Sequence, residues 1–220
     1  MNALDLVNAV LRDKLKFSNE AGDLSVVTGE ARSILRALNE IKDELLERHE
    51  FPSTKKKGTL TLATGMDTYP LASDVNRPLS FYYARDFSVN AAYPKFNYVG
   101  DDEFLDHEGI NTTEGLPYIG RSFGQDGSGH KVVQVYFVPS SGFNGSSLYY
   151  DYVRSWPDAA ANADLFPFPD SVMIEGAFMK RRSGAGTMST EDFKWFNDLV
   201  QQHIRNTVKG TRKRIPYRDI

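Results

Sequence analysis

The chain has 220 residues, of which 40% are hydrophobic and 25% charged, and its formal net charge is −3. This composition is typical of a globular protein with one or two domains, and a chain of this length buries roughly 70% of its unfolded surface without cross-links. The absence of cysteine excludes disulfides and Cys-based zinc or thiol sites. No apolar run approaches the ~20 residues that a membrane-spanning helix needs.

Two amphipathic helices are predicted at the start of the chain. Apolar residues recur at helical spacing over residues 2–16, and the charged residues between them argue against a secretion signal. Thr28 is suited to cap a second helix over residues 28–49. We expect this helix to end before Pro52, because a residue that precedes proline disfavours helix. Its apolar stripe consists of Ile34, Leu38, Ile41, Leu45 and Leu46.

From residue 58 to about residue 156 the pattern is that of β-strands. The stretch LTLATGMDTYPLASDV, residues 60–75, has two apolar segments around a glycine turn and is interpreted as the first hairpin of an inserted unit. Further strands are predicted in PLSFYYAR, LPYIGRSF, HKVVQVYFV and SSLYYDYVR. The segments 126–129 and 144–145 fit the turns between the last three. Short strands separated by glycine turns indicate a small sandwich or barrel.

Helical periodicity returns near residue 170. Asp170 is suited to cap a helix over residues 170–182, and Ser189 is suited to cap one over residues 189–208. Each of the four predicted helices is apolar on one stripe only, so two isolated hairpins would leave these stripes in water. Packing the four helices together is the arrangement that buries them.

The predicted fold is therefore α+β. It is a four-helix bundle built from both chain ends, with an inserted antiparallel β-sandwich or barrel-like unit. We expect residues 1–57 and 157–209 to form the bundle, residues 58–156 to form the β domain, and residues 210–220 to form an extended C-terminal arm.

The densest cluster of ionisable residues is DDEFLDHEG, residues 101–109. On a helix Asp102 and Asp106 share one face, a spacing that suits Ca²⁺ or Mg²⁺, but these ions need more ligands than two. The alternative, which is favoured, is a solvated acidic turn with Phe104 and Leu105 buried. The four histidines are scattered, and no hydrolase or phosphate-loop motif occurs. We therefore expect no enzyme, no metal and no cofactor, although a glycan hydrolase with paired carboxylates stays as an alternative.

Aromatic residues are concentrated in two predicted strands. Alternation along each strand places Tyr82 and Tyr150 on the outer face, and it places Phe81, Tyr83, Tyr149 and Asp151 on the other. Half-buried aromatics commonly stabilise sheets, and outward tyrosines also suit a protein interface. A sugar-binding β module of a phage tail or cell-surface protein is the alternative function.

The end of the chain is basic, with six Lys or Arg and no acid between Arg205 and Arg218. It is open to three interpretations: a solvated end, a nucleic-acid contact, or a segment that docks on an acidic protein. Ile215, Pro216 and Tyr217 lie among the charges and favour a groove-binding segment over a purely electrostatic one.

The order of these motifs resembles that of the head-to-tail adaptor proteins of tailed bacteriophages. Members have an apolar-Thr-x-x-x-Gly-x-x-x-Tyr-x-Leu-Pro-x-Asp element, and LTLATGMDTYPLASDV is similar, with Pro70 displaced. EGLPYIGRSF, VVQVYFVPSSG and LYYDYVRSWP are similar to later strands of the family, and FPFPDSVMIEGAFMK is similar to the segment that starts its last helices.

This resemblance implies a virion protein at the head–tail junction, assembled in the host cytoplasm. It implies a homo-oligomeric ring, commonly of twelve subunits, between the capsid portal protein and a tail or nozzle protein. DNA would pass through the channel without sequence-specific binding, and no membrane is involved. The C-terminal arm would dock on the portal. The portal-binding residues would be Lys209, Arg212, Lys213, Arg214, Ile215, Tyr217 and Arg218.

Overall fold

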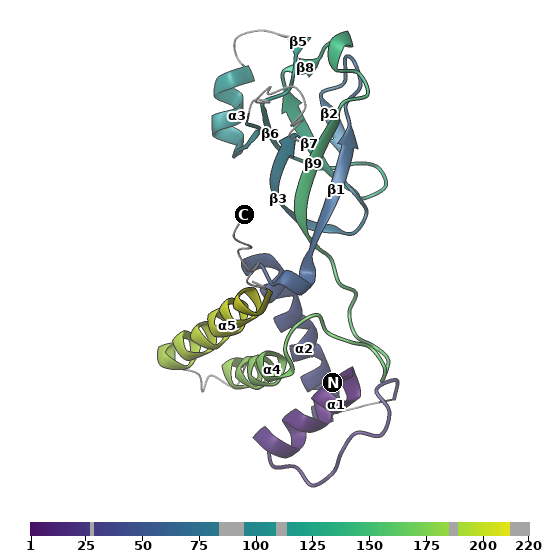
Figure 1. The fold of residues 1–220 in the computed structure, drawn as a ribbon. Helices are drawn as coiled ribbons and strands as arrows, with labels where there is room; N and C mark the ends of the chain where they lie inside the picture. The colour runs from purple at the N-terminus through teal and green to yellow at the C-terminus, as the bar shows by residue number, and fades with distance from the viewer. Residues whose placement is uncertain (27–28, 84–94, 109–113, 185–188, 212–220) are drawn as a thin grey trace, which may run out of the picture. The chain divides into compact units, whose positions relative to one another are not determined.

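The computed structural model describes residues 1–26, 29–83, 95–108, 114–184 and 189–211 (Figure 1). The chain divides into two compact units. The helical unit consists of Met1–Thr54 and Trp156–Ile220, and the β unit consists of Lys55–Ser155.

The described part of the helical unit contains four α-helices and two short helical turns. The α-helices are α1 (Ala3–Ala9), α2 (Gly29–Arg48), α4 (Asp170–Gly184) and α5 (Thr190–Thr211), and the turns are a π-helix (Val10–Lys14) and a 3-10 turn (Pro52–Thr54). Asn2 caps α1 by accepting a hydrogen bond from the Asp5 amide at 2.8 Å. The predicted helix over residues 2–16 is therefore an α-helix that widens into a π-turn and stops before Lys16, which has a positive φ of 60°.

Helix α4 lies at the centre of this unit and packs on α1, α2 and α5. Val172, Met173 and Ala177 on α4 are fully buried, and they meet the buried side chains of the neighbouring helices. Burial of this apolar surface, at about 25 cal/mol per Å², is the main force that holds the unit together.

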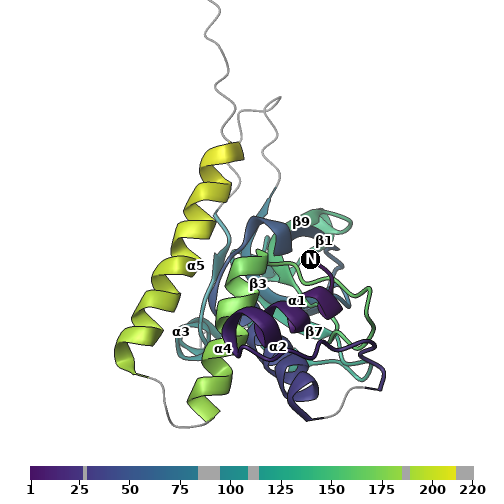
Figure 2. The same ribbon diagram turned by 90° about the horizontal axis from the view of Figure 1, so that it is seen from below.

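The predicted four-helix bundle is wrong. Helix α5 packs on α4 and the 3-10 turn, whereas a bundle would place it along α2 as well. Figures 1 and 2 show α4 and α5 crossing α2 steeply instead of running beside it. Phe196 and Val200 of the α5 stripe are buried, but Phe193 is 51% exposed. The physical reason is that α1 is too short to form a fourth wall, so α5 covers one side of α4 and leaves part of its own stripe in water.

The β unit contains nine strands, one helix and one 3-10 turn among its described residues. The strands are β1 (Lys55–Thr61), β2 (Thr68–Pro70), β3 (Val75–Tyr83), β4 (Asn97–Tyr98), β5 (Glu114–Gly115), β6 (Ile119–Gln125), β7 (Lys131–Tyr136), β8 (Val138–Pro139) and β9 (Ser147–Arg154). The helix is α3 (Asp101–Glu108), and the turn is Ser141–Phe143.

The sheets are mixed, so the prediction of a purely antiparallel unit is also wrong. Their strand orders are β1-β9-β3, β2-β7-β6-β4 and β5-β8. Strand β4 is parallel to β6, and β5 is parallel to β8, whereas the other pairs are antiparallel. The parallel β4–β6 pair arises because α3 carries the chain back between them, as a parallel connection requires a crossover.

Residues 60–75 do not form a hairpin. Strand β1 pairs with β9, and β2 pairs with β7, so the chain changes sheet at the turn between them. The Tyr69 hydroxyl fixes this corner by accepting from the Ala63 amide at 3.1 Å and donating to the Met66 carbonyl at 2.9 Å. The predicted turn at 126–129 is confirmed between β6 and β7, and Gly129 supplies its positive φ of 81°.

Inner faces of the two larger sheets form the core of the β unit. Leu148 and Tyr150 of β9 and Val133 of β7 are almost completely buried there. A second, smaller cluster forms where Phe104 of α3 packs on Ile119 and Tyr136.

Candidate functional site

Portal binding is predicted for seven residues at the C-terminal end, and the structure describes one of them. Lys209 lies in the last turn of α5. The others lie outside the described residues: Arg212, Lys213, Arg214, Ile215, Tyr217 and Arg218. Portal docking by these residues stays a prediction.

The acidic cluster forms helix α3, which is the crossover between β4 and β6. Phe104 is buried as predicted, at 1% exposure, but Leu105 is 51% exposed, contrary to the prediction. The Arg121 guanidinium lies 4.6 Å from the centre of the Phe104 ring and 3.5 Å from an Asp101 carboxylate oxygen. Within the described ranges, no three His, Asp or Glu side chains are grouped as a metal site would require.

The faces predicted for the strand aromatics are partly wrong. Phe81 pairs with Tyr150 and both lie in the core, whereas Tyr82 pairs with Tyr149 on the outer face, where their rings stack at 6.0 Å. Lys57 lies over the Tyr82 ring with its Nζ 6.0 Å from the ring centre. The sequence could not give this pairing, because it depends on the register between β3 and β9 and on the bulges in β3.

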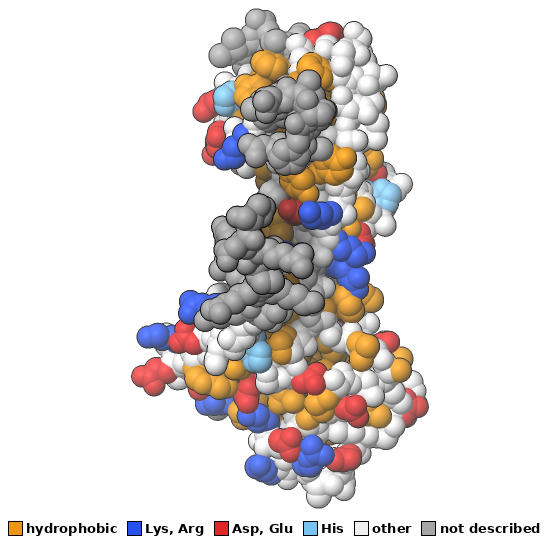
Figure 3. All heavy atoms as spheres, viewed as in Figure 1, with side chains coloured by type: hydrophobic (Ala, Val, Ile, Leu, Met, Phe, Trp, Pro, Cys, Tyr) orange, Lys and Arg blue, Asp and Glu red, His pale blue; other side chains and the backbone are white. Residues whose placement is uncertain are grey.

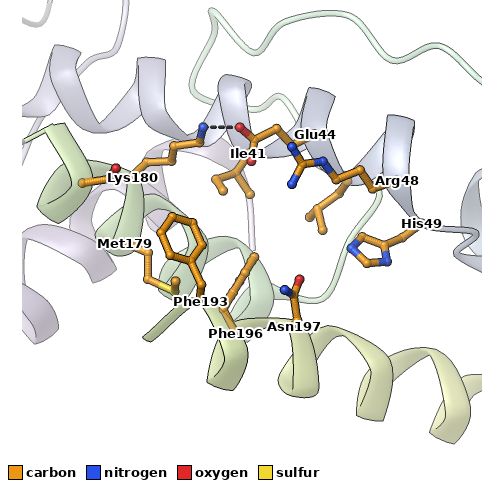
Figure 4. A pocket seen from close by; sticks show the side chains of 11 residues that line it. Ile41, Glu44, Arg48, His49, Met179, Lys180, Phe193, Phe196 and Asn197 are labelled. Atoms are coloured by element: carbon orange, nitrogen blue, oxygen red, sulfur yellow. Dashed lines mark hydrogen bonds and ion pairs between the residues drawn. The ribbon is translucent and has the colours of Figure 1, made fainter. Parts of the chain in front are cut away.

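A groove in the helical unit was not predicted. It has a volume of about 280 Å³ and lies between α2, α4 and α5 (Figure 4). The residues that line it are Ile41, Glu44, Leu45, Arg48, His49, Met179, Lys180, Ser183, Phe193, Phe196 and Asn197. We call this surface the α5 groove. On the face that Figure 3 shows, hydrophobic side chains of the helical unit lie at the surface between charged ones.

The floor of the α5 groove depends on a close approach of three helices. A Cβ atom on Gly176 of α4 would lie 2.8 Å from Ile41 Cγ2 and 3.0 Å from Phe196 Cζ. These distances are shorter than ordinary carbon contacts, so only glycine allows α2 and α5 to come this close to α4. The three helices thus meet at the floor of the groove, around Gly176, and diverge towards its solvent-facing opening.

Three ion pairs hold the helices around the groove. Lys180 on α4 pairs with Glu44 on α2, and Arg182 on α4 pairs with Asp192 on α5 at 3.3 Å. Arg181 pairs with Glu30 at the start of α2, and this hydrogen bond raises the pKa of the Arg181 guanidinium. The pKa of Asp192 is lowered because the Ser189 backbone and hydroxyl donate to its carboxylate.

The electrostatics of the α5 groove leave one net positive charge at its rim. Glu44 and Lys180 neutralise each other, and the described residues offer Arg48 no ion-pair partner. An apolar floor with a guanidinium at the rim suits an apolar side chain next to a carboxylate. The sequence contained one signal for this surface, Phe193 of α5, which lines the groove and is 51% exposed.

No helix within the described residues is long and apolar enough to cross a membrane.

Comparison with known proteins identifies one family. The sequence model of the SU10 adaptor proteins matches residues 1–203. A search of curated proteins finds no match. The matched range covers the β unit and most of the helical unit, and it ends within α5, before Lys209 and the rest of the predicted portal-binding residues.

Proposed function

We propose a head-to-tail function for this chain, which belongs to the SU10 adaptor protein family and is therefore a structural adaptor protein of a bacteriophage. In this proposal, copies of the chain form a ring between the capsid portal protein and a tail or nozzle protein. The ring has twelve subunits, as the resemblance of the sequence motifs implies, and DNA passes through its channel without sequence-specific binding.

The family match carries the proposal, because it extends over both units in a single range of residues. The surfaces of the chain support it. A ring subunit needs two different contact faces and needs no catalytic site. The half-covered stripe of α5 and the α5 groove supply apolar surface of the kind that protein interfaces bury.

Attachment to the portal is assigned to the C-terminal arm. Its basic residues attract an acidic surface, and Ile215 and Tyr217 supply apolar anchors. Binding of this kind depends on salt, because the charged contacts are screened within about 8 Å at physiological ionic strength.

Co-sedimentation with the portal protein tests this assignment. Deletion of residues 211–220 is expected to leave the circular dichroism spectrum of both units unchanged and to abolish co-sedimentation. Replacement of Arg212, Lys213 and Arg214 by Ser is expected to slow association, and replacement of Ile215 and Tyr217 by Ser is expected to speed dissociation. Portal binding that survives the deletion, or loss of DNA binding alone, would refute the assignment.

The alternative is sugar binding by the β unit. The stacked Tyr82 and Tyr149 rings beside Lys57 are the observation that favours it. A glycan array distinguishes the two functions, because the adaptor proposal expects no glycan to bind and expects Tyr82→Ala to leave portal binding unchanged.

A further inference from the structure

Two surfaces of the helical unit complement each other in polarity and charge. One is the α5 groove. The other is the segment of residues 17–26 between the π-helix and α2, which we call the acidic loop. Figures 1 and 2 show α5 at one side of the unit, and they show the chain between α1 and α2 running along a different side. One copy therefore cannot bring its own loop to its own groove.

Polar contacts fix the shape of the acidic loop. The Ala21 amide donates to Asn8 Oδ1 at 2.7 Å, and Asn8 Nδ2 donates to the Ala21 carbonyl at 3.1 Å. Further along, Leu24 is buried, and its amide donates to Asn162 Oδ1 at 2.7 Å. A loop held at two points is ordered before it meets a partner, which lowers the entropic cost of binding.

The anchored loop presents apolar and acidic side chains to solvent. Phe17 is 50% exposed and Val26 is 74% exposed, the highest value among the large hydrophobic residues that the structure describes. Glu20 and Asp23 lie between them, and the segment itself contains no Lys or Arg. Glu20 pairs with Arg12 of the π-helix at 3.4 Å, so Asp23 is the acid that the loop presents to a partner. The Ser25 amide donates to the Asp23 carboxylate at 2.9 Å and lowers its pKa, so this group stays charged.

The α5 groove offers the opposite pattern. Phe193 is half exposed at its edge, Ile41 and Phe196 lie below, and Arg48 at the rim is exposed without an ion-pair partner among the described residues. The basic C-terminal arm of the chain is a poor occupant, because its charges have the same sign as Arg48.

We propose that the acidic loop of one copy docks in the α5 groove of the next copy, with Val26 against Phe193 and Asp23 facing Arg48. This inference rests on the proposed function, since it assigns the surfaces by which ring subunits meet. The two surfaces are different and lie on different sides of one unit. Such a heterologous contact leaves a free loop at one end of the growing oligomer and a free groove at the other. Further copies can therefore add until the two ends meet and the ring closes.

Engineered cysteines test the contact directly, because the chain contains no native cysteine. The full-length variant with Val26→Cys and Asn197→Cys is treated with a short bismaleimide cross-linker, alone and with the portal protein. Each single variant carries a cysteine on only one side of the proposed contact, in the loop or in the groove. We therefore expect the double variant to give a covalent ladder of oligomers and the single variants to stay uncross-linked. The matched control combines Val26→Cys with Phe123→Cys. Phe123 belongs to the β unit and is as exposed as Phe193 of the groove, and this variant is expected to give no ladder.

A charge exchange gives an independent test. Asp23→Arg or Arg48→Asp alone is expected to weaken self-association at least tenfold, and the two together are expected to restore it. Arg32→Asp, at another exposed position of α2, serves as the control.

The proposal is overturned if the double-cysteine variant gives no ladder, or if the charge exchange fails to restore association. If the variants still co-sediment with the portal as rings, the proposed function stands and only the assigned surfaces are wrong. If the wild-type protein forms no ring with the portal, the proposed function fails as well.

Discussion

Gly58 of β1 lies directly opposite Tyr150 of β9, and its replacement by alanine tests the packing of the β unit. A Cβ atom at this position would lie 2.5 Å from the Tyr150 hydroxyl oxygen and 2.6 Å from its Cε1. The ring is 1% exposed and cannot move into solvent, and its hydroxyl accepts from the Ala72 amide at 3.0 Å. Gly58→Ala therefore forces the ring to shift inside a packed core.

The expected cost has two parts. Overpacking a core costs about 1–3 kcal/mol, and loss of the hydrogen bond from the amide of Ala72, an exposed residue, costs about 0.5–1.5 kcal/mol. Alanine recovers roughly 0.5–1 kcal/mol in a strand relative to glycine. The net loss in the free energy of unfolding is about 0.5–4 kcal/mol, which corresponds to a fall in Tm of at least about 2 °C for a unit of this size.

Urea denaturation separates the two units. Both tryptophans, Trp156 and Trp195, belong to the helical unit, whereas every tyrosine except Tyr217 belongs to the β unit. Near-UV circular dichroism of the tyrosines is therefore expected to report the loss of stability of the β unit in Gly58→Ala.

Two variants control for this result. Gly127→Ala is expected to change stability by less than about 0.5 kcal/mol, because a Cβ atom there has open space. Tyr150→Leu removes the ring, so Gly58→Ala is expected to cost less in that background. Equal effects of Gly58→Ala and Gly127→Ala would show that the Tyr150 ring does not pack closely against Gly58.

Three further predictions concern the helical unit, an acidic residue and metal binding. Gly176→Ala is expected to lower the stability of the helical unit by up to about 2 kcal/mol, because overpacking exceeds the gain in helix propensity, whereas Gly184→Ala, with open space around it, is expected to be neutral or stabilising. The Asp74 carboxylate accepts from Lys56 and Tyr152, which lowers its pKa, so its stabilising effect is present above about pH 4 and is lost as the pH falls through the lowered value. Urea denaturation at a series of pH values from neutral to acid is expected to show that Asp74→Asn loses less unfolding free energy on acidification than the wild type. Calcium or magnesium is expected to leave the Tm unchanged in the wild type and in the variant with Asp102→Asn and Asp106→Asn.

Each of these predictions has a result that contradicts it. Tryptophan fluorescence showing that Gly176→Ala stabilises the helical unit would mean that the helices do not meet at this glycine. If stability falls with acid pH in Asp74→Asn as it does in the wild type, the contacts of the Asp74 carboxylate contribute nothing to stability. A metal-dependent rise in Tm for the wild type alone would establish a cation site on α3.

Local pattern predicted several elements but not how they pack. The helix expected over 28–49 is Gly29–Arg48, and those expected over 170–182 and 189–208 are Asp170–Gly184 and Thr190–Thr211. Periodicity and capping residues determine such ranges locally. Their assembly depends on which stripes meet, and the widening of α1 into a π-turn is not visible in the apolar spacing. The four-helix bundle failed for this reason.

Register and crossover connections limited the prediction of the β unit. A strand pattern says which residues share a face within one strand, but pairing decides which face is inside, so Tyr150 was placed outward when it is buried. The turn around Gly65 resembles that of a hairpin, yet it joins two sheets. The segment that forms α3 was predicted as a solvated acidic turn, and its role as a crossover follows only from the parallel pairing of β4 with β6.

The α5 groove could not be predicted, because it consists of residues from three helices that are far apart in the sequence. The exposed Phe193 of α5 was its one local signal. The basic C-terminal arm has the opposite character, since its charge is obvious in the sequence while its contacts depend on a partner.

Electron microscopy of the full-length protein mixed with its portal protein tests the head-to-tail assignment most directly. We expect a closed ring of adaptor subunits stacked coaxially on one end of the portal, and we expect deletion of residues 211–220 to remove this ring from the portal. Portal particles that stay bare in the presence of excess wild-type protein would contradict this assignment.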